Sequence, residues 1–131
     1  MGLKILIVDD SAFARSFIKR SIMICGIEDA EFREAANGEE AQVLIQSEYI
    51  DIIFTDLNMP DMTGDELLKS IKTNPIHSDI PVVVVTSLNN PAREKDLLEH
   101  HATAVLDKPI SLDKLDLILI NDLKIKKGVN L

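Results

Sequence analysis

Short apolar runs alternate along the chain with segments in which apolar residues recur every three or four positions. The runs lie at Lys4–Val8, Ala30–Ala35, Ile50–Thr55, Ile80–Val85 and Ala104–Leu106. Stretches such as Ile-Leu-Ile-Val and Val-Val-Val-Val lack polar alternation, which is typical of strands covered on both faces. Charged residues interrupt Ala30–Ala35. We therefore expect that strand at an edge of a sheet, where one side meets water.

Helices are predicted between these runs, with capping residues at several ends. The predicted ranges are Ala12–Cys25, Glu39–Ser47, Asp65–Thr73, Pro91–His100 and Leu112–Lys124. Ser11 is an N-cap and Gly26 a stop signal for the first. Its inward face is expected to hold Ala14, Phe17, Ile18, Ile22 and Cys25. Strands alternating with helices in this way predict an α/β fold, a parallel sheet with helices on both faces.

The length of 131 residues suits one domain, which we place at residues 1–125, followed by a C-terminal tail at 126–131. The formal charge of −8 argues against nucleic-acid binding, which needs a surplus of cations. Cys25 is the single cysteine, so no internal disulfide framework is possible, and a reducing cytoplasm is expected. No secretory signal and no membrane-spanning stretch is predicted.

Polar side chains stand where the predicted strands end. Asp9-Asp10 follow the first run, Asp56 the third and Thr86-Ser87 the fourth, and Asp107-Lys108-Pro109 follow the fifth. In a parallel sheet, the carboxyl ends of the strands share one edge, where ligands bind. We therefore expect three carboxylates, a hydroxyl and an ammonium group to meet there.

Carboxylates brought together repel one another unless a cation resolves the repulsion. Lys108 supplies one positive charge, and a divalent ion would supply more. Oxygen ligands without His or Cys favour Mg²⁺ over Zn²⁺. The residues thus predict a phosphoryl-transfer site with one carboxylate as nucleophile. The alternative for any single aspartate is that it only begins a loop or caps a helix.

Several stretches together resemble the receiver domain of two-component response regulators, of the single-domain chemotaxis type. They are ILIVDDSAFAR, EAANGEEA, DIIFTDLNMPDMTGDELL, IPVVVVTS and AVLDKPI. They span nearly the whole chain in the family's order. The resemblance implies a flavodoxin-like, doubly wound (βα)5 fold whose five-stranded parallel sheet has the order 2-1-3-4-5.

The resemblance also implies roles for the residues at the strand ends. Asp56 would be the phosphoacceptor, taking a phosphoryl group from a phosphohistidine of a sensor histidine kinase or a histidine phosphotransfer protein. Asp9 and Asp10, with Asp56 and the backbone carbonyl of Asn58, would hold Mg²⁺. Thr86 would bond the phosphoryl group and Lys108 would pair with it.

Three further positions would support the switch. Ser87 follows the hydroxyl residue, and Pro109 would follow a cis bond that holds Lys108 in place. At Val105 the family often has an aromatic ring that swings inward on activation. The chain has no ring there, so a movement of Thr86 and its loop is the expected switch. The family tunes the phosphoryl lifetime at the positions of Asn58 and Leu88.

The last predicted helix is unusually apolar, and one helical face buries only about half of its circumference. If Leu115, Ile118 and Leu119 face the core, Leu117 and Ile120 lie to one side. We expect those two residues to form a surface for a homodimer or a downstream target protein. A deeply packed last helix is the alternative.

The expected function is therefore a phosphorylation-dependent signalling switch and not an enzyme acting on a separate substrate. A phosphoryl shuttle or sink and a degenerate receiver that only binds proteins are alternatives. A haloacid-dehalogenase-like phosphatase is disfavoured because Asn58 stands where its second acid is needed. Because the chain ends after its fifth helix, no output domain is expected; a stand-alone protein and an excised domain both fit.

Overall fold

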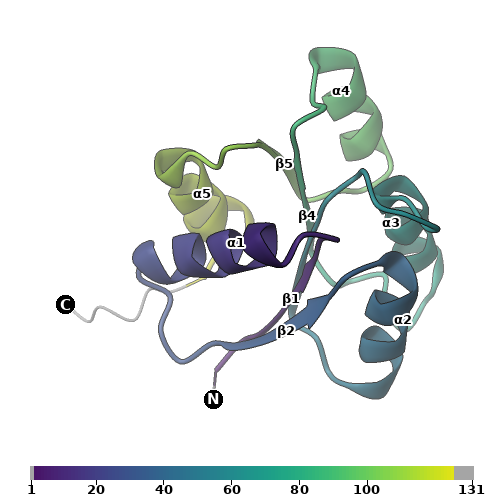
Figure 1. Cartoon of the computed structure of the whole chain (residues 1–131), viewed down its shortest axis with the longest axis horizontal. Helices are drawn as coiled ribbons and strands as arrows, with labels where there is room; N and C mark the ends of the chain where they lie inside the picture. The colour runs from purple at the N-terminus through teal and green to yellow at the C-terminus, as the bar shows by residue number, and fades with distance from the viewer. Residues whose placement is uncertain (1, 126–131) are drawn as a thin grey trace.

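A computed structural model of the chain describes residues 2–125 (Figure 1). These residues form five strands: β1 (Lys4–Val8), β2 (Glu31–Ala35), β3 (Ile52–Thr55), β4 (Val82–Thr86) and β5 (Ala104–Asp107). Between and after them lie α1 (Ala12–Ile24), α2 (Gly38–Ser47), α3 (Gly64–Thr73), α4 (Pro91–Glu99), α5 (Leu112–Leu117) and the π-helical turn η1 (Ile118–Asp122). The alternation of strands and helices is as predicted.

The strands form one parallel sheet of order β2-β1-β3-β4-β5. This order confirms the doubly wound, flavodoxin-like fold. The charged strand β2 lies at one edge and pairs only with β1, as its sequence predicts. The central strands β1, β3 and β4 are buried almost throughout, which explains their unbroken apolar sequences.

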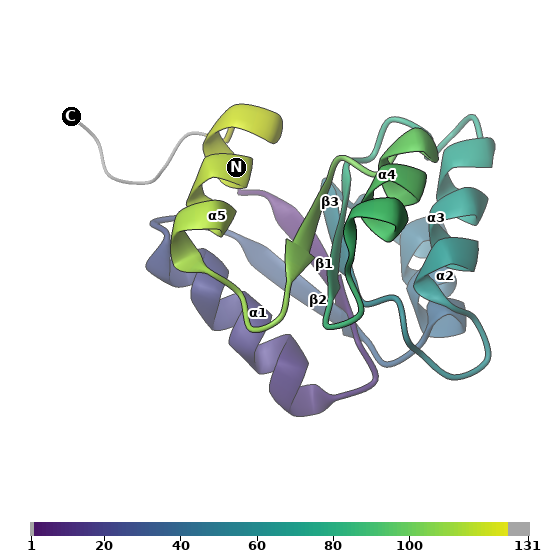
Figure 2. The ribbon, with the colours of Figure 1, turned by 90° about the horizontal axis from the view of Figure 1, so that it is seen from above.

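The sheet separates two helical layers and two apolar cores (Figure 2). Helices α1 and α5 cover one face, and α2, α3 and α4 cover the other. Successive residues of β1 alternate between the cores: Ile5 and Ile7 join the α1–α5 side, whereas Leu6 and Val8 join the opposite side. Because both faces are packed, the edge formed by the carboxyl ends of the strands remains available for polar groups.

Each α-helix begins at a polar side chain that accepts a backbone hydrogen bond. The five N-caps are Ser11, Asn37, Thr63, Asn90 and Ser111. The Ser11 cap was predicted from sequence, and Gly26 after α1 has a φ of 96°, in the left-handed region that its stop role requires. These caps fix where each helix starts relative to the preceding strand end.

Two predictions about helices are wrong. The predicted last helix, Leu112–Lys124, changes its winding after Leu117, and the Leu123 N–H bonds the Ile118 carbonyl five residues earlier. This wider turn keeps Ile118 and Leu119 buried together with Leu115. In α1, Phe17 is 43% exposed instead of inward, because it lies at the border of the helix face that buries Ile18 and Ile22.

The tail predicted at residues 126–131 lies outside the described residues. Among the described helices, none combines the length and apolar character that crossing a membrane requires.

Candidate phosphoryl-transfer site

Three carboxylates converge at the carboxyl edge of the sheet. Asp9 and Asp10 follow β1, and Asp56 follows the neighbouring strand β3. One oxygen from each lies within 4.8 Å of the others. Asp9 and Asp56 are buried, whereas Asp10 is exposed. The predicted juxtaposition of these residues is therefore present.

Lys108 reaches this cluster from the loop after β5. Its Nζ lies 2.7 Å from Asp9 Oδ2 and 3.6 Å from Asp56 Oδ2. The peptide bond between Lys108 and Pro109 is cis, as the resemblance implied. One ammonium group faces three carboxylates, so the cluster carries a surplus of negative charge.

Burial and the neighbouring charges both act on the pKa of Asp56. Burial raises the pKa of this carboxyl above its ordinary value; attraction to Lys108 opposes the shift, and repulsion from Asp9 adds to it. For Lys108, burial alone would lower the pKa, but the hydrogen bond to Asp9 and the attraction of both carboxylates raise it. The charged form of Lys108 is therefore favoured, whereas ionisation of Asp56 costs free energy that further positive charge would relieve.

Backbone N–H groups orient the two buried carboxylates. The Ser11 N–H donates to Asp9 Oδ1 over 2.9 Å, and the Leu57 N–H donates to Asp56 Oδ1 over 2.8 Å. Asp56 Oδ1 is thus held by the main chain, and Oδ2 is the oxygen that faces Lys108. This arrangement leaves Oδ2 as the candidate nucleophile.

Gly64 is a site residue whose role sequence reasoning missed. Its N–H donates to the Leu57 carbonyl over 2.9 Å, which places the start of α3 against the Asp56–Leu57 backbone. A Cβ at this position would collide with the Asp56 carbonyl oxygen and would lie 2.7 Å from Leu57 Cα. A glycine following the capping residue Thr63 was the available signal.

Arg15 was missed as well. Its Nη1 donates to the Asp9 carbonyl over 2.7 Å, and its Nε donates to Glu34 Oε1, also over 2.7 Å. The guanidinium group thereby ties the β1–α1 loop to α1 and to β2. Arg15 lies four residues after the capping Ser11, a helix position that gave no indication of this contact.

The remaining predicted residues lie in β4, in β5 and in the loops after β3 and β4. Thr86 is fully buried at the end of β4, and its Oγ1 accepts a hydrogen bond from the Leu88 N–H over 3.0 Å. Ser87 and Asn58 are exposed in the loops after β4 and β3. Val105 is half-buried in β5. The structure thus places these residues near the edge without assigning them roles.

An apolar groove of about 330 Å³ adjoins the cluster and shares Lys108 with it. Its other lining residues come from α1, the end of β4 and the loop before α5: Phe13, Ala14, Phe17, Ile18, Val85, Pro109 and Ile110. Phe13 is 82% exposed. The exposure of Phe17, which contradicts the sequence prediction, creates one wall of this groove.

The residues at the acidic cluster fit a hard divalent cation. All three side chains offer carboxylate oxygens, and the one ammonium group cannot balance their charge. Oxygen ligands of this kind suit Mg²⁺. The donor set therefore agrees with the ion predicted from sequence.

Comparison with known proteins places these features in a family. Residues 5–120 match the model of the response regulator receiver domain. The chain belongs to this family. As a receiver, it is a signalling domain of two-component systems with the acidic pocket at which such domains bind Mg²⁺.

Individual relatives agree with this assignment. The receiver is 33% identical over 110 residues to a chemotaxis protein CheY homolog of Campylobacter jejuni, covering 83% of each chain. It is 36% identical over 106 residues to a gliding motility regulatory protein of Myxococcus xanthus, covering 81% of this chain but only 13% of that much longer protein.

Solved structures give the same fold. The chemotaxis response regulator CheY4 of Vibrio cholerae is 30% identical, with a TM-score of 0.80, and the match covers 93% of this receiver and 99% of that chain. A response regulator receiver protein from Pseudomonas putida is 25% identical, with a TM-score of 0.78 and coverage of 92% and 97%. The receiver thus has the fold of both solved structures over nearly their whole length.

Proposed function

We propose that this receiver is a phosphorylation-dependent switch that accepts a phosphoryl group on Asp56 from a histidine kinase or a histidine phosphotransfer protein. The observation that carries the proposal is the position of Asp56. One oxygen is fixed by the Leu57 N–H, and the other faces Lys108 within a cluster of acids. We place the whole switch within residues 1–125.

In the proposed reaction, Asp56 Oδ2 attacks the phosphorus of a phosphohistidine. A P–O bond forms and the P–N bond breaks, and its electron pair stays on the imidazole, which takes up a proton from solvent. Hydrolysis of the resulting acyl phosphate resets the switch. This is phosphoryl transfer to the protein itself, so the chain has no separate substrate to turn over.

The surrounding groups position and neutralise the reactants. Asp9, Asp10, Asp56 and the carbonyl of Asn58 would hold Mg²⁺, which supplies positive charge to the phosphoryl oxygens. Lys108 remains protonated and pairs with the developing negative charge. Thr86 donates its hydroxyl hydrogen to a phosphoryl oxygen, and the exposed Ser87 allows the chain beyond Thr86 to follow.

The phosphodonor docks along the apolar groove between α1 and the loop after β5. Lys108 lines both this groove and the acidic cluster, so a helix resting on Phe13 and Phe17 would bring its histidine toward Asp56. Helix α1 carries three cationic residues and no acidic one, in a chain of formal charge −8. An apolar helix with acidic flanks is the partner surface that fits.

A second surface lies on the last helical segment. Leu117 is 58% exposed and Ile120 is 44% exposed, while Leu115, Ile118 and Leu119 are buried. This division between core and surface matches the sequence prediction and contradicts the alternative of a deeply packed helix. We propose that a second copy of the chain or a downstream target protein docks there.

Phosphorylation is tested by mass. The full chain is incubated with acetyl phosphate and Mg²⁺, and the intact protein is weighed. We expect a gain of one phosphoryl group that is absent from Asp56→Asn, is removed by hydroxylamine as an acyl phosphate is, and disappears with EDTA. Failure with acetyl phosphate, with phosphoramidate and with a panel of phosphorylated histidine phosphotransfer proteins would favour the degenerate receiver.

A further inference from the structure

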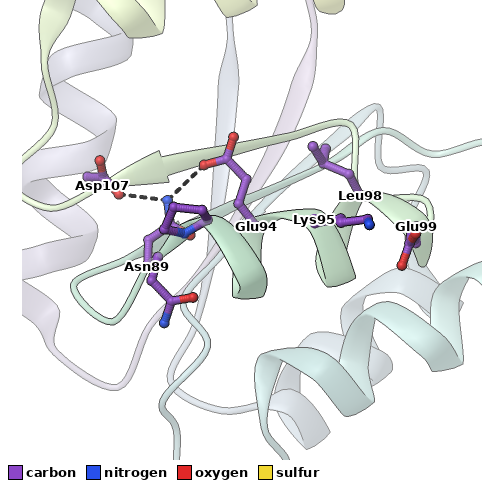
Figure 3. Close-up of a pocket in the computed structure, with 8 residues that line it drawn as sticks. Asn89, Glu94, Lys95, Leu98, Glu99 and Asp107 are labelled. Carbon is purple, nitrogen blue, oxygen red and sulfur yellow. Dashed lines mark hydrogen bonds between the residues drawn. The ribbon is translucent and has the colours of Figure 1, made fainter.

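The side-chain amide of Asn89 joins two carboxylates that come from different elements (Figure 3). Its Nδ2 donates to Glu94 Oε1 over 2.9 Å and to Asp107 Oδ1 over 2.8 Å. Asn89 belongs to the loop between β4 and α4, Glu94 to α4, and Asp107 to the end of β5. We call this arrangement the Asn89 bridge; it lines a groove of about 740 Å³ between α4 and β5.

The side-chain amide of Asn89 has only one favourable orientation in this bridge. Both hydrogens of Nδ2 are used, and a flipped amide would turn its oxygen toward two carboxylates. Asn89 Oδ1 is buried and has no hydrogen-bond partner among the described residues. The NH₂ group is therefore what allows two like charges to approach each other, and removing it leaves them to repel.

The same loop and strand end also carry the groups that respond to phosphate. Asp107 is the sheet partner of Thr86, and the Lys108 N–H donates to the Thr86 carbonyl over 3.0 Å. The Leu88 N–H donates to Thr86 Oγ1 over 3.0 Å. Asn89 is thus the next residue after Leu88, whose N–H bonds the Thr86 hydroxyl, and Asp107 is the residue before Lys108. A displacement of Thr86 toward Asp56 would therefore act on the loop and the strand end that the bridge connects.

We propose that Asn89 is a positioning residue that holds the β4–α4 loop in its unphosphorylated position. Phosphorylation of Asp56 draws Thr86 and its loop toward the phosphoryl group and breaks the bridge. Glu94 and Asp107 then lose their shared donor and move apart, which changes how their two negative charges are arranged in the groove between α4 and β5. The bridge thereby couples the acidic cluster to the groove between α4 and β5. This coupling needs no aromatic ring at position 105, where the chain has Val105. This inference rests on the proposed phosphorylation.

The test compares the affinity of folded variants for beryllofluoride, a stable mimic of a phosphoryl group on an aspartate, in saturating Mg²⁺. If the bridge opposes the phosphorylated arrangement, then by reciprocity its removal strengthens binding of the mimic. We expect Asn89→Ala to lower the dissociation constant by roughly threefold to tenfold, the effect of losing from one state two hydrogen bonds that are weakened by exposure to solvent.

Two companion variants separate the bridge from general charge effects. Glu94→Ala removes one acceptor and should tighten binding as well, whereas Glu99→Ala removes the same charge from the same helix and groove without touching the bridge. The double variant Asn89→Ala/Glu94→Ala should bind no more tightly than the stronger single variant, because both changes break one interaction.

A spectroscopic measurement keeps the test independent of stability. In the unliganded Asn89→Ala variant, the Leu88 amide NMR signal should move toward its position in the wild type bound to beryllofluoride. Unchanged or weaker binding in both bridge variants, with the wild type binding normally, overturns the inference. If the wild type itself neither binds the mimic nor becomes phosphorylated, the proposed function fails and the inference with it.

Discussion

The two loops that flank the candidate site are held in opposite ways. After β3, the Asp56–Leu57 backbone lies so close to Gly64 that a single added carbon has no space. After β4, Ser87 and Leu88 are exposed, and the loop is held by a hydrogen bond that Thr86 Oγ1 accepts and by two that Asn89 Nδ2 donates. Close backbone packing fixes the main chain at Asp56, the proposed nucleophile, whereas exchangeable hydrogen bonds hold the loop after Thr86. The proposed phosphoacceptor thus lies in closely packed backbone, beside a loop that is held by hydrogen bonds.

The largest expected effect comes from adding one methyl group at Gly64, against the loop after β3. Gly64→Ala should destabilise the fold by about 2 kcal/mol, because the clash of up to about 3 kcal/mol with rigid backbone exceeds the roughly 1 kcal/mol that alanine contributes to a helix. It should also slow the reaction with acetyl phosphate by roughly tenfold, since Asp56 is displaced. Urea unfolding and intact mass measure the two effects.

The control for that comparison is Ser87→Ala in the exposed loop. This change should alter the free energy of unfolding by no more than about 0.5 kcal/mol. Equal effects at Gly64 and Ser87 would show that the two loops do not differ in rigidity.

A smaller effect is expected from removing the charge of the nucleophile. Because the pKa of Asp56 is raised in the folded state, the unfolded chain releases this proton first as pH rises, and ionised Asp56 then costs stability. Without metal, Asp56→Asn should therefore be more stable than the wild type at pH 7, by on the order of 1 kcal/mol. The difference should vanish near pH 3, where both states are protonated.

Mg²⁺ supplies the control for the charge experiment. Saturating Mg²⁺ should stabilise the wild type more than Asp56→Asn, because only the wild type presents all three carboxylates. Thermal unfolding in EDTA and in Mg²⁺, at pH 3 and pH 7, measures these differences. A variant less stable than the wild type at pH 7 in EDTA would mean that attraction to Lys108 outweighs burial.

The smallest effect on stability is expected away from both loops, on the last helical segment. Leu117→Glu and Ile120→Glu should each change the free energy of unfolding by less than about 0.5 kcal/mol, because both side chains are exposed. Self-association or target binding, measured by sedimentation of the free and phosphorylated forms, should fall. Val43→Glu on α2, also exposed, is the matched control. Unchanged association in both variants rules out this surface.

The strands and the polar residues at their ends could be predicted from the sequence. The strands were predictable because β1, β3 and β4 are apolar on both faces, and Asp9, Asp56 and Lys108 were predictable because parallel strands end at a common edge. These inferences need only the local pattern and the direction of the chain. The edge position of β2 followed from its charges in the same way.

Features that depend on contact between elements distant in the sequence could not be predicted from the sequence. The crowding at Gly64 depends on how closely α3 approaches β3, and the groove beside Phe17 depends on how α1 meets the loop after β5. The Asn89 bridge joins residues 18 positions apart, and neither the loop nor the strand sequence indicates it. The π-helical turn likewise follows from how Ile118 and Leu119 pack.

The alternation of side chains at the end of β5 has a consequence for evolution. Asp107 takes part in the Asn89 bridge, while the next residue, Lys108, reaches the acidic cluster. If the proposed bridge controls activation, substitutions at Asn89, Glu94 or Asp107 would alter how readily the receiver is activated and would leave the proposed phosphate-binding groups in place. Sensitivity could then be changed independently of the chemistry.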